Sequence, residues 1–175
     1  MKRIPDITLQ QMDTGAVNVG RATERQRAKR KEVGIIGDRA NFGFKNGDNT
    51  VYLYAHWGGH QMLDRLAQAL QCVVNENRLG DPSYATRIAI SNIIGNDWSK
   101  GTGYGITVNE LADNEHSVPV VDWEKGTVSL HDWGWTPDNG LYITWENPKF
   151  VMSIPIFIQK FLKTPVEKPL TYTRV

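Results

Sequence analysis

The sequence is poor in cysteine, and this shortage excludes two kinds of covalent framework. Cys72 is the single cysteine among 175 residues, so the chain can close no internal disulfide. It also lacks the cysteine pairs of structural zinc sites. Cys72 falls among apolar residues at the end of a helical pattern, which favours a buried thiol over a reactive nucleophile.

Long apolar runs are also lacking. No segment approaches the roughly 18 apolar residues that a membrane-spanning helix requires. The N-terminal Met-Lys-Arg-Ile-Pro-Asp belongs to no apolar run of signal-peptide length. We therefore expect a cytoplasmic protein that does not contact a membrane.

An excess of charge of one sign is the third missing feature. The formal net charge is +1, with 20 Lys and Arg against 19 Asp and Glu, so the whole chain has no attraction for nucleic acid or lipid. Nucleic-acid binding is expected only from the basic cluster at 21–31. A solvated arm or a subunit contact is the favoured explanation of that cluster, because no aromatic residue interleaves with its charges.

The composition is otherwise that of a globular domain. Hydrophobic residues make up 40% and charged residues 22% of the chain, and its length fits one domain. We divide it into a polar basic N-terminal arm at 1–33, a core domain at 34–146, and a C-terminal amphipathic helix and tail at 147–175.

The apolar periodicity predicts a single α+β domain, with a mainly antiparallel sheet of five to seven strands and two or three packed helices. The predicted strands cover 40–45, 50–56, 104–108, 117–122, 127–132 and 141–145, and the predicted helices cover 60–71, 81–95 and 153–162. Asp81 is expected to cap the second helix, with Pro82 at its first position. Pro119 cannot donate to a ladder, so its strand is expected at an edge or with a bulge.

The most informative segment runs from a strand through two glycines into a helix. Tyr52, Tyr54 and His56 alternate along the strand and share one face, which suits the wall of a groove. Gly58 and Gly59 leave backbone amides uncovered before the helix, so a phosphate, a carboxylate or a ribose hydroxyl could dock there. A tight turn that needs a positive φ angle is the alternative.

His56 and His60 bracket Trp57 and the glycines, and this spacing raises the question of a metal site. Two imidazoles four residues apart share a face in a helix, which the glycines disfavour. No glutamate lies between the histidines as zincin motifs require. We therefore expect no metal site and no cofactor, and we assign both histidines a structural or ligand-contact role.

Two polar or glycine-rich segments supply further candidates. The glycines around Tyr104 lack the lysine of a P-loop, but they could open space for a planar ligand, or form a bulge. Asn114, Glu115 and His116 share one short loop and could provide a general base or position a ribose. A solvated loop is the alternative for these three residues.

Arg39 and Arg87 are the cations of most interest. Arg39 precedes a strand, and Arg87 falls among apolar residues of a predicted helix, where a guanidinium needs an anion or a carboxylate partner. An intramolecular ion pair with Asp64 or another carboxylate is the alternative for Arg87.

Several blocks in a fixed order resemble small proteins of tailed bacteriophages, a group for which no activity is established. The blocks are Arg39-Ala-Asn-Phe-Gly-Phe, the HWGG segment at 51–59, Asp81-Pro-Ser-Tyr-Ala-Thr-Arg-Ile, Thr102-Gly-Tyr-Gly-Ile, Asp113-Asn-Glu-His and Val120-Val-Asp. They span about residues 39–132. The resemblance implies phage origin, a compact domain and a location in the host cytoplasm, and it assigns no catalytic roles.

Three hypotheses of function follow. The first is a non-enzymatic phage accessory protein that binds a nucleotide-like or other anionic small ligand and so sequesters a host defence signal. The second is an inhibitor that docks on a host enzyme through exposed tryptophans such as Trp98, Trp133 and Trp135, assisted by the basic arm. The third is a hydrolase or transferase, and whether the chain catalyses any reaction stays open.

The residues of these sites overlap. The hydrolase or transferase would use His56, Glu115 and His116. The predicted ligand-binding residues are Arg39, Tyr52, Tyr54, His56, Trp57, Gly58, Gly59, His60, Arg87, Tyr104, Asn114, Glu115 and His116. Edge strands and the amphipathic C-terminal segment need covering, which is compatible with a homo-oligomer.

Overall fold

The structure is a computed structural model and describes residues 37–163. The predicted arm at 1–33, its basic cluster at 21–31 and the tail after 163 lie outside the described residues. The described residues belong to one compact unit. Among them, no helix is long and apolar enough to cross a membrane.

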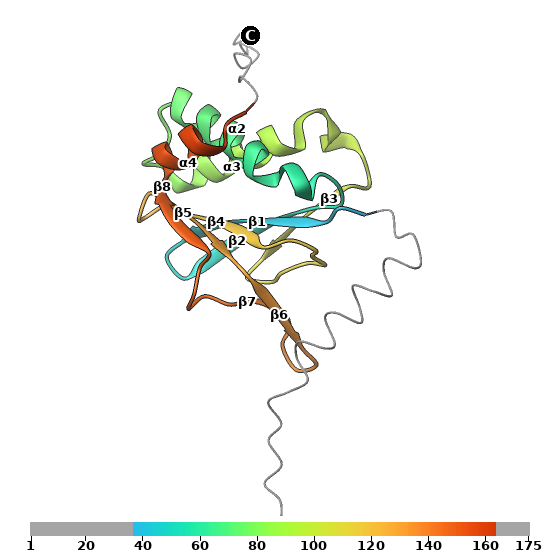
Figure 1. Ribbon diagram of the computed structural model, residues 1–175. Helices are drawn as coiled ribbons and strands as arrows, with labels where there is room; N and C mark the ends of the chain where they lie inside the picture. The colour runs from blue at the N-terminus through green and yellow to red at the C-terminus, as the bar shows by residue number, and fades with distance from the viewer. Residues whose placement is uncertain (1–36, 164–175) are drawn as a thin grey trace, which may run out of the picture. The chain divides into compact units, whose positions relative to one another are not determined.

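The described chain has eight strands, three α-helices and two short 3₁₀ helices (Figure 1). In chain order they are β1 (Ala40–Asn46), β2 (Asn49–Ala55), η1 (Gly59–Gln61), α2 (Met62–Asn75), α3 (Pro82–Ile94), η2 (Gly95–Ser99), β3 (Tyr104–Val108), β4 (Val118–Asp122), β5 (Thr127–His131), β6 (Trp133–Thr136), β7 (Gly140–Ile143), β8 (Phe150–Ser153) and α4 (Ile154–Phe161).

Six strands form the main sheet in the order β3-β2-β1-β4-β5-β8, and β6 and β7 form a separate two-stranded sheet. β1 and β4 run parallel, and the other neighbouring strands are antiparallel. This confirms the predicted single α+β domain with a mainly antiparallel sheet.

The three helices cover one face of the main sheet (Figure 1). Phe42 and Phe44 alternate along β1 toward the helices and are almost fully buried, as the two-residue period of a strand requires. Leu66, Leu70 and Val73 are buried along one side of α2, at the spacing of a helical face. Their packing against the sheet forms the main hydrophobic core.

A smaller core lies on the opposite face of the sheet. Tyr52, Val118, Val120 and Ile143 are buried there, and Trp133 packs against them. Ile143 and Trp133 come from β7 and β6, so the two-stranded sheet contributes to the cover of this face (Figure 1).

The structure corrects two details of the predicted strands. Pro119 lies in β4, between β1 and β5 and not at an edge, because the parallel ladder with β1 begins one residue later, at Val120, and requires no N–H from the proline. The strands β6 and β8 were not predicted. The α3 cap is confirmed, since the Asp81 side chain accepts a hydrogen bond from the backbone N–H of Tyr84.

Candidate metal centre

Three loops meet at one end of the β1 strand. Because β1 is antiparallel to β2 and parallel to β4, the start of β1 lies beside the end of β2 and the start of β4. Asp38 precedes β1, His60 follows β2, and His116 precedes β4. The strand pairing therefore brings together one carboxylate and two imidazoles that are far apart in the sequence.

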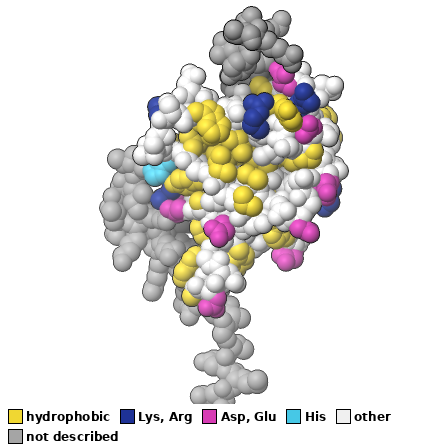
Figure 2. All heavy atoms as spheres, turned by 180° about the vertical axis from the view of Figure 1, so that it is seen from behind, with side chains coloured by type: hydrophobic (Ala, Val, Ile, Leu, Met, Phe, Trp, Pro, Cys, Tyr) yellow, Lys and Arg dark blue, Asp and Glu magenta, His cyan; other side chains and the backbone are white. Residues whose placement is uncertain are grey.

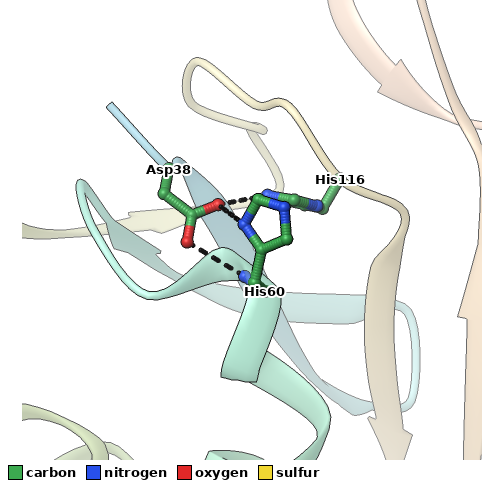
Figure 3. A group of neighbouring side chains, drawn as sticks. All are labelled: Asp38, His60 and His116. Atoms are coloured by element: carbon green, nitrogen blue, oxygen red, sulfur yellow. Dashed lines mark hydrogen bonds and ion pairs between the residues drawn. The ribbon is translucent and has the colours of Figure 1, made fainter. Parts of the chain in front are cut away.

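These three side chains, which we call the Asp38 cluster, point toward one another (Figure 3). The Oδ1 atom of Asp38 lies 2.7 Å from Nδ1 of His60 and 2.6 Å from Nε2 of His116. The imidazole rings are 4.9 Å apart and close to perpendicular. The side chain of His60 is 83% exposed, whereas those of Asp38 and His116 are 27% and 22% exposed.

Hydrogen bonds favour the charged form of the carboxylate. Burial raises the pKa of Asp38, but the backbone N–H of His60 and the side chains of His116 and His60 lower it by more. The pKa of Asp38 therefore lies below its usual value of 3.8, and the group is a carboxylate near neutral pH.

The double glycine is required by the cluster. Gly58 has a φ angle of 85°, which non-glycine residues rarely adopt. A Cβ atom on Gly59 would lie 2.3 Å from Cδ2 of His116 and 2.9 Å from the backbone oxygen of Asp38. Gly58 therefore makes the turn, and Gly59 leaves space for the His116 ring.

The backbone amides predicted to bind an anion have partners within the protein. The N–H of Gly59 donates to the backbone oxygen of Asp38 at 2.9 Å, and the N–H of His60 donates to the carboxylate Oδ2 of Asp38 at 3.0 Å. Asp38 thus occupies the position in which the sequence suggested an external anion. The His60 N–H holds its carboxylate, and the Gly59 N–H holds its backbone.

His56 lies outside the cluster. Its Nδ1 atom is 2.8 Å from the hydroxyl of Tyr54, and its ring contacts the Trp57 ring edge to face. Trp57 is 52% exposed, and Tyr104 bonds through its hydroxyl to the guanidinium of Arg65. These predicted residues form a neighbouring aromatic group, and His60 is paired with Asp38 and not with His56.

Arg39 and the loop before β4 hold His116 in position. Arg39 makes ion pairs with Asp113 and Glu115, and the backbones of Arg39 and Glu115 are also linked, through the Glu115 N–H and the Arg39 oxygen. Asn114 is fully buried and bonds to the side chain of Asn41 and to the backbone oxygen of His116. The predicted residues Arg39, Asn114 and Glu115 thus position the loop that carries His116.

Two predicted ligand residues lie elsewhere. Tyr52 is 5% exposed and belongs to the smaller core, and burial raises the pKa of its hydroxyl. Arg87 is exposed on α3.

The tryptophans of the docking hypothesis differ in exposure. Trp98 and Trp135 are more than half exposed, as a docking surface would need, whereas Trp133 packs against the smaller core.

The cluster has the chemistry of a transition-metal site. One ligand atom from each residue lies within 4.8 Å of the others, and two imidazoles with one carboxylate are a ligand set for Zn²⁺ and Fe²⁺. Tetrahedral bonds of about 2.1 Å would separate nitrogen and oxygen ligands by about 3.4 Å. An ion would therefore lengthen the two contacts of Asp38 by less than about 1 Å, and would shorten a separation as long as 4.8 Å by up to about 1.4 Å. The exposed His60 allows these movements.

The sequence argument against a metal considered the His56 and His60 pair, and the structure gathers a different set. Asp38 was not a candidate, because nothing around it in the sequence marks it as a ligand. No protein-family model, curated protein or solved structure matches this chain. The interpretation of the site therefore depends on its geometry.

Proposed function

We propose that this chain binds a divalent transition-metal ion, with Zn²⁺ as the first choice, through the Asp38 cluster. One observation carries the proposal: a carboxylate oxygen and two imidazole nitrogens from three separate segments of the chain lie within 4.8 Å of one another. The amide that holds Asp38 and the glycine that admits His116 support it, since metal ligands are commonly oriented by such neighbouring groups.

A phage accessory protein that binds a small ligand remains the proposed function. The difference is that a bound metal ion, and not the glycine amides or Arg39, would hold the ligand. The Gly59 and His60 amides already donate to Asp38, and Arg39 is paired with Asp113 and Glu115. A bound cation would supply the positive charge for an anionic ligand that these groups do not offer.

The test is calorimetric titration of the full chain with ZnCl₂ after removal of metals with a chelator. We expect one Zn²⁺ per chain. His116→Ala and His60→Ala should each weaken binding at least about tenfold, because loss of even an outer-shell partner of a metal ligand costs about 10–100-fold.

His56→Ala is the matched control, because His56 belongs to the same HWGG segment but its side chain bonds to Tyr54 and not to Asp38. Its backbone oxygen, which accepts from the Asp38 N–H, is unchanged by the substitution. The variant should bind Zn²⁺ as the unaltered chain does. Failure of the unaltered chain to bind Zn²⁺, or equal binding by His116→Ala, would overturn the proposal.

A further inference from the structure

We infer that the metal-loaded Asp38 cluster binds the phosphate group of a small phosphorylated ligand as an additional metal ligand. The inference rests on the proposed function and names the class of ligand. Within the described residues the cluster contributes three ligand atoms. A tetrahedral Zn²⁺ held by three protein ligands keeps one position for an external molecule.

The remaining position is open to solvent. His60 is the most exposed member of the cluster, and Asp38 and His116 are partly exposed. On the face drawn in Figure 2, histidine, basic and acidic side chains lie close together at the border of a hydrophobic area. Because the side chains of the cluster are exposed or partly exposed, a small molecule can approach them without rearrangement of the described core.

The charge of the loaded site favours an anion. A divalent cation and the Asp38 carboxylate together leave a net charge of +1 at the metal, and the ion-paired Arg39, Asp113 and Glu115 beside His116 add −1. Arg65 adds a second positive charge, since its guanidinium lies beside Gly58, two residues before His60. Among the described residues Arg65 bonds to the oxygens of Trp57, Ile93 and Tyr104 and makes no ion pair, so no carboxylate neutralises it there.

Phosphate fits this arrangement better than a carboxylate. It carries about two negative charges near neutral pH and has several acceptor oxygens, so one oxygen can bind the metal while others face the guanidinium. Arg65 has five N–H donors, and its recorded hydrogen bonds within the described residues leave one N–H on Nη1 for such a contact.

The test uses the full chain loaded with Co²⁺, whose visible absorption bands report a change of metal ligand. Inorganic phosphate, adenosine monophosphate and adenosine are titrated into the loaded protein and the metal-free protein. We expect phosphate and the monophosphate to shift the bands and adenosine to leave them unchanged. The metal-free protein should bind phosphate at least about tenfold more weakly.

Arg65→Gln should bind Co²⁺ normally but should bind phosphate roughly tenfold more weakly. Arg87→Gln is the control, because Arg87 is exposed on α3. It should bind both Co²⁺ and phosphate as the unaltered chain does. Three results would overturn the inference: bands that phosphate leaves unchanged, equal phosphate binding without metal, or equal binding of adenosine and its monophosphate. Unchanged bands with Co²⁺ bound would leave the metal site standing, so the two proposals fail separately.

Discussion

Gly59 is the residue on which the geometry of the Asp38 cluster depends most directly. Its hydrogen faces the His116 ring, and a Cβ atom there would lie within 2.5 Å of Nε2. We expect Gly59→Ala to displace His116, to weaken Zn²⁺ binding at least about tenfold, and to destabilise the fold by about 1–3 kcal/mol through overpacking. Calorimetry with Zn²⁺ and thermal unfolding measure the two effects.

Gly101→Ala is the control for this substitution. No atom would lie within 4 Å of a Cβ atom at Gly101, so metal binding and stability should stay close to those of the unaltered chain. If Gly59→Ala bound Zn²⁺ normally, the close contact between residue 59 and His116 would have no role in metal binding.

At this scale the sequence identified part of the cluster. His60 and His116 were candidates because imidazoles next to glycines or acidic residues attract a functional interpretation. Asp38 was not, since a single aspartate before a strand has no distinguishing pattern. The partner of His60 was also hidden, because the spacing of His56 and His60 in the sequence says nothing about Asp38, which precedes β1.

Among the elements, α4 shows how a helix near the end of the described chain joins the core. It begins at Ile154, directly after β8, and packs on α2. Phe157 is fully buried, and its ring centre lies 6.3 Å from that of Phe150 and 4.8 Å from that of Phe161. Ile156 is the neighbouring residue and is 55% exposed.

We expect Phe157→Ala to lower the free energy of unfolding by about 3–5 kcal/mol, because it removes a large buried side chain and leaves a cavity. Ile156→Ala should change it by less than about 0.5 kcal/mol. Denaturant unfolding of both variants provides the comparison. Similar losses for the two substitutions would show that α4 does not pack through Phe157.

The sequence predicted the elements with clear periodicity and missed two of the three four-residue strands. The helices α2, α3 and α4 have apolar residues at helical spacing, and α3 also has its Asp81 and Pro82 start signal. Four residues are few for establishing a two-residue period; β6 and β8 were missed, whereas β7 was predicted because its alternation continues to Trp145. The pairing of β6 with β7 and of β8 with β5 depends on neighbours that local sequence does not identify.

For the molecule as a whole, stability should depend on pH through His131 in β5. Burial lowers the pKa of His131 from its ordinary 6.5, outweighing the bond to the backbone oxygen of Thr144. Below about pH 6.5 the unfolded chain therefore binds a proton that the folded chain does not. The stability that neutral His131 contributes to the fold is fully present above pH 6.5 and is lost as the pH falls toward the pKa of His131 in the folded chain.

We expect the free energy of unfolding, measured in metal-free buffer, to fall as the pH is lowered from about 7 to about 5.5. His131→Gln should flatten this slope, whatever its effect on stability at neutral pH. His56→Gln is the matched control and should keep most of the slope. An unchanged slope in His131→Gln would show that other groups cause the pH dependence.

The sequence by itself determined the class of the domain and most of its elements, because hydrophobic period, caps and glycine turns are local properties. The tertiary structure alone decided that Asp38 meets His60 and His116, which are 22 and 78 residues away along the chain. That meeting follows from β1 lying antiparallel to β2 and parallel to β4. Strand order is set by hydrogen bonding and packing over the whole sheet, so no local pattern contains it.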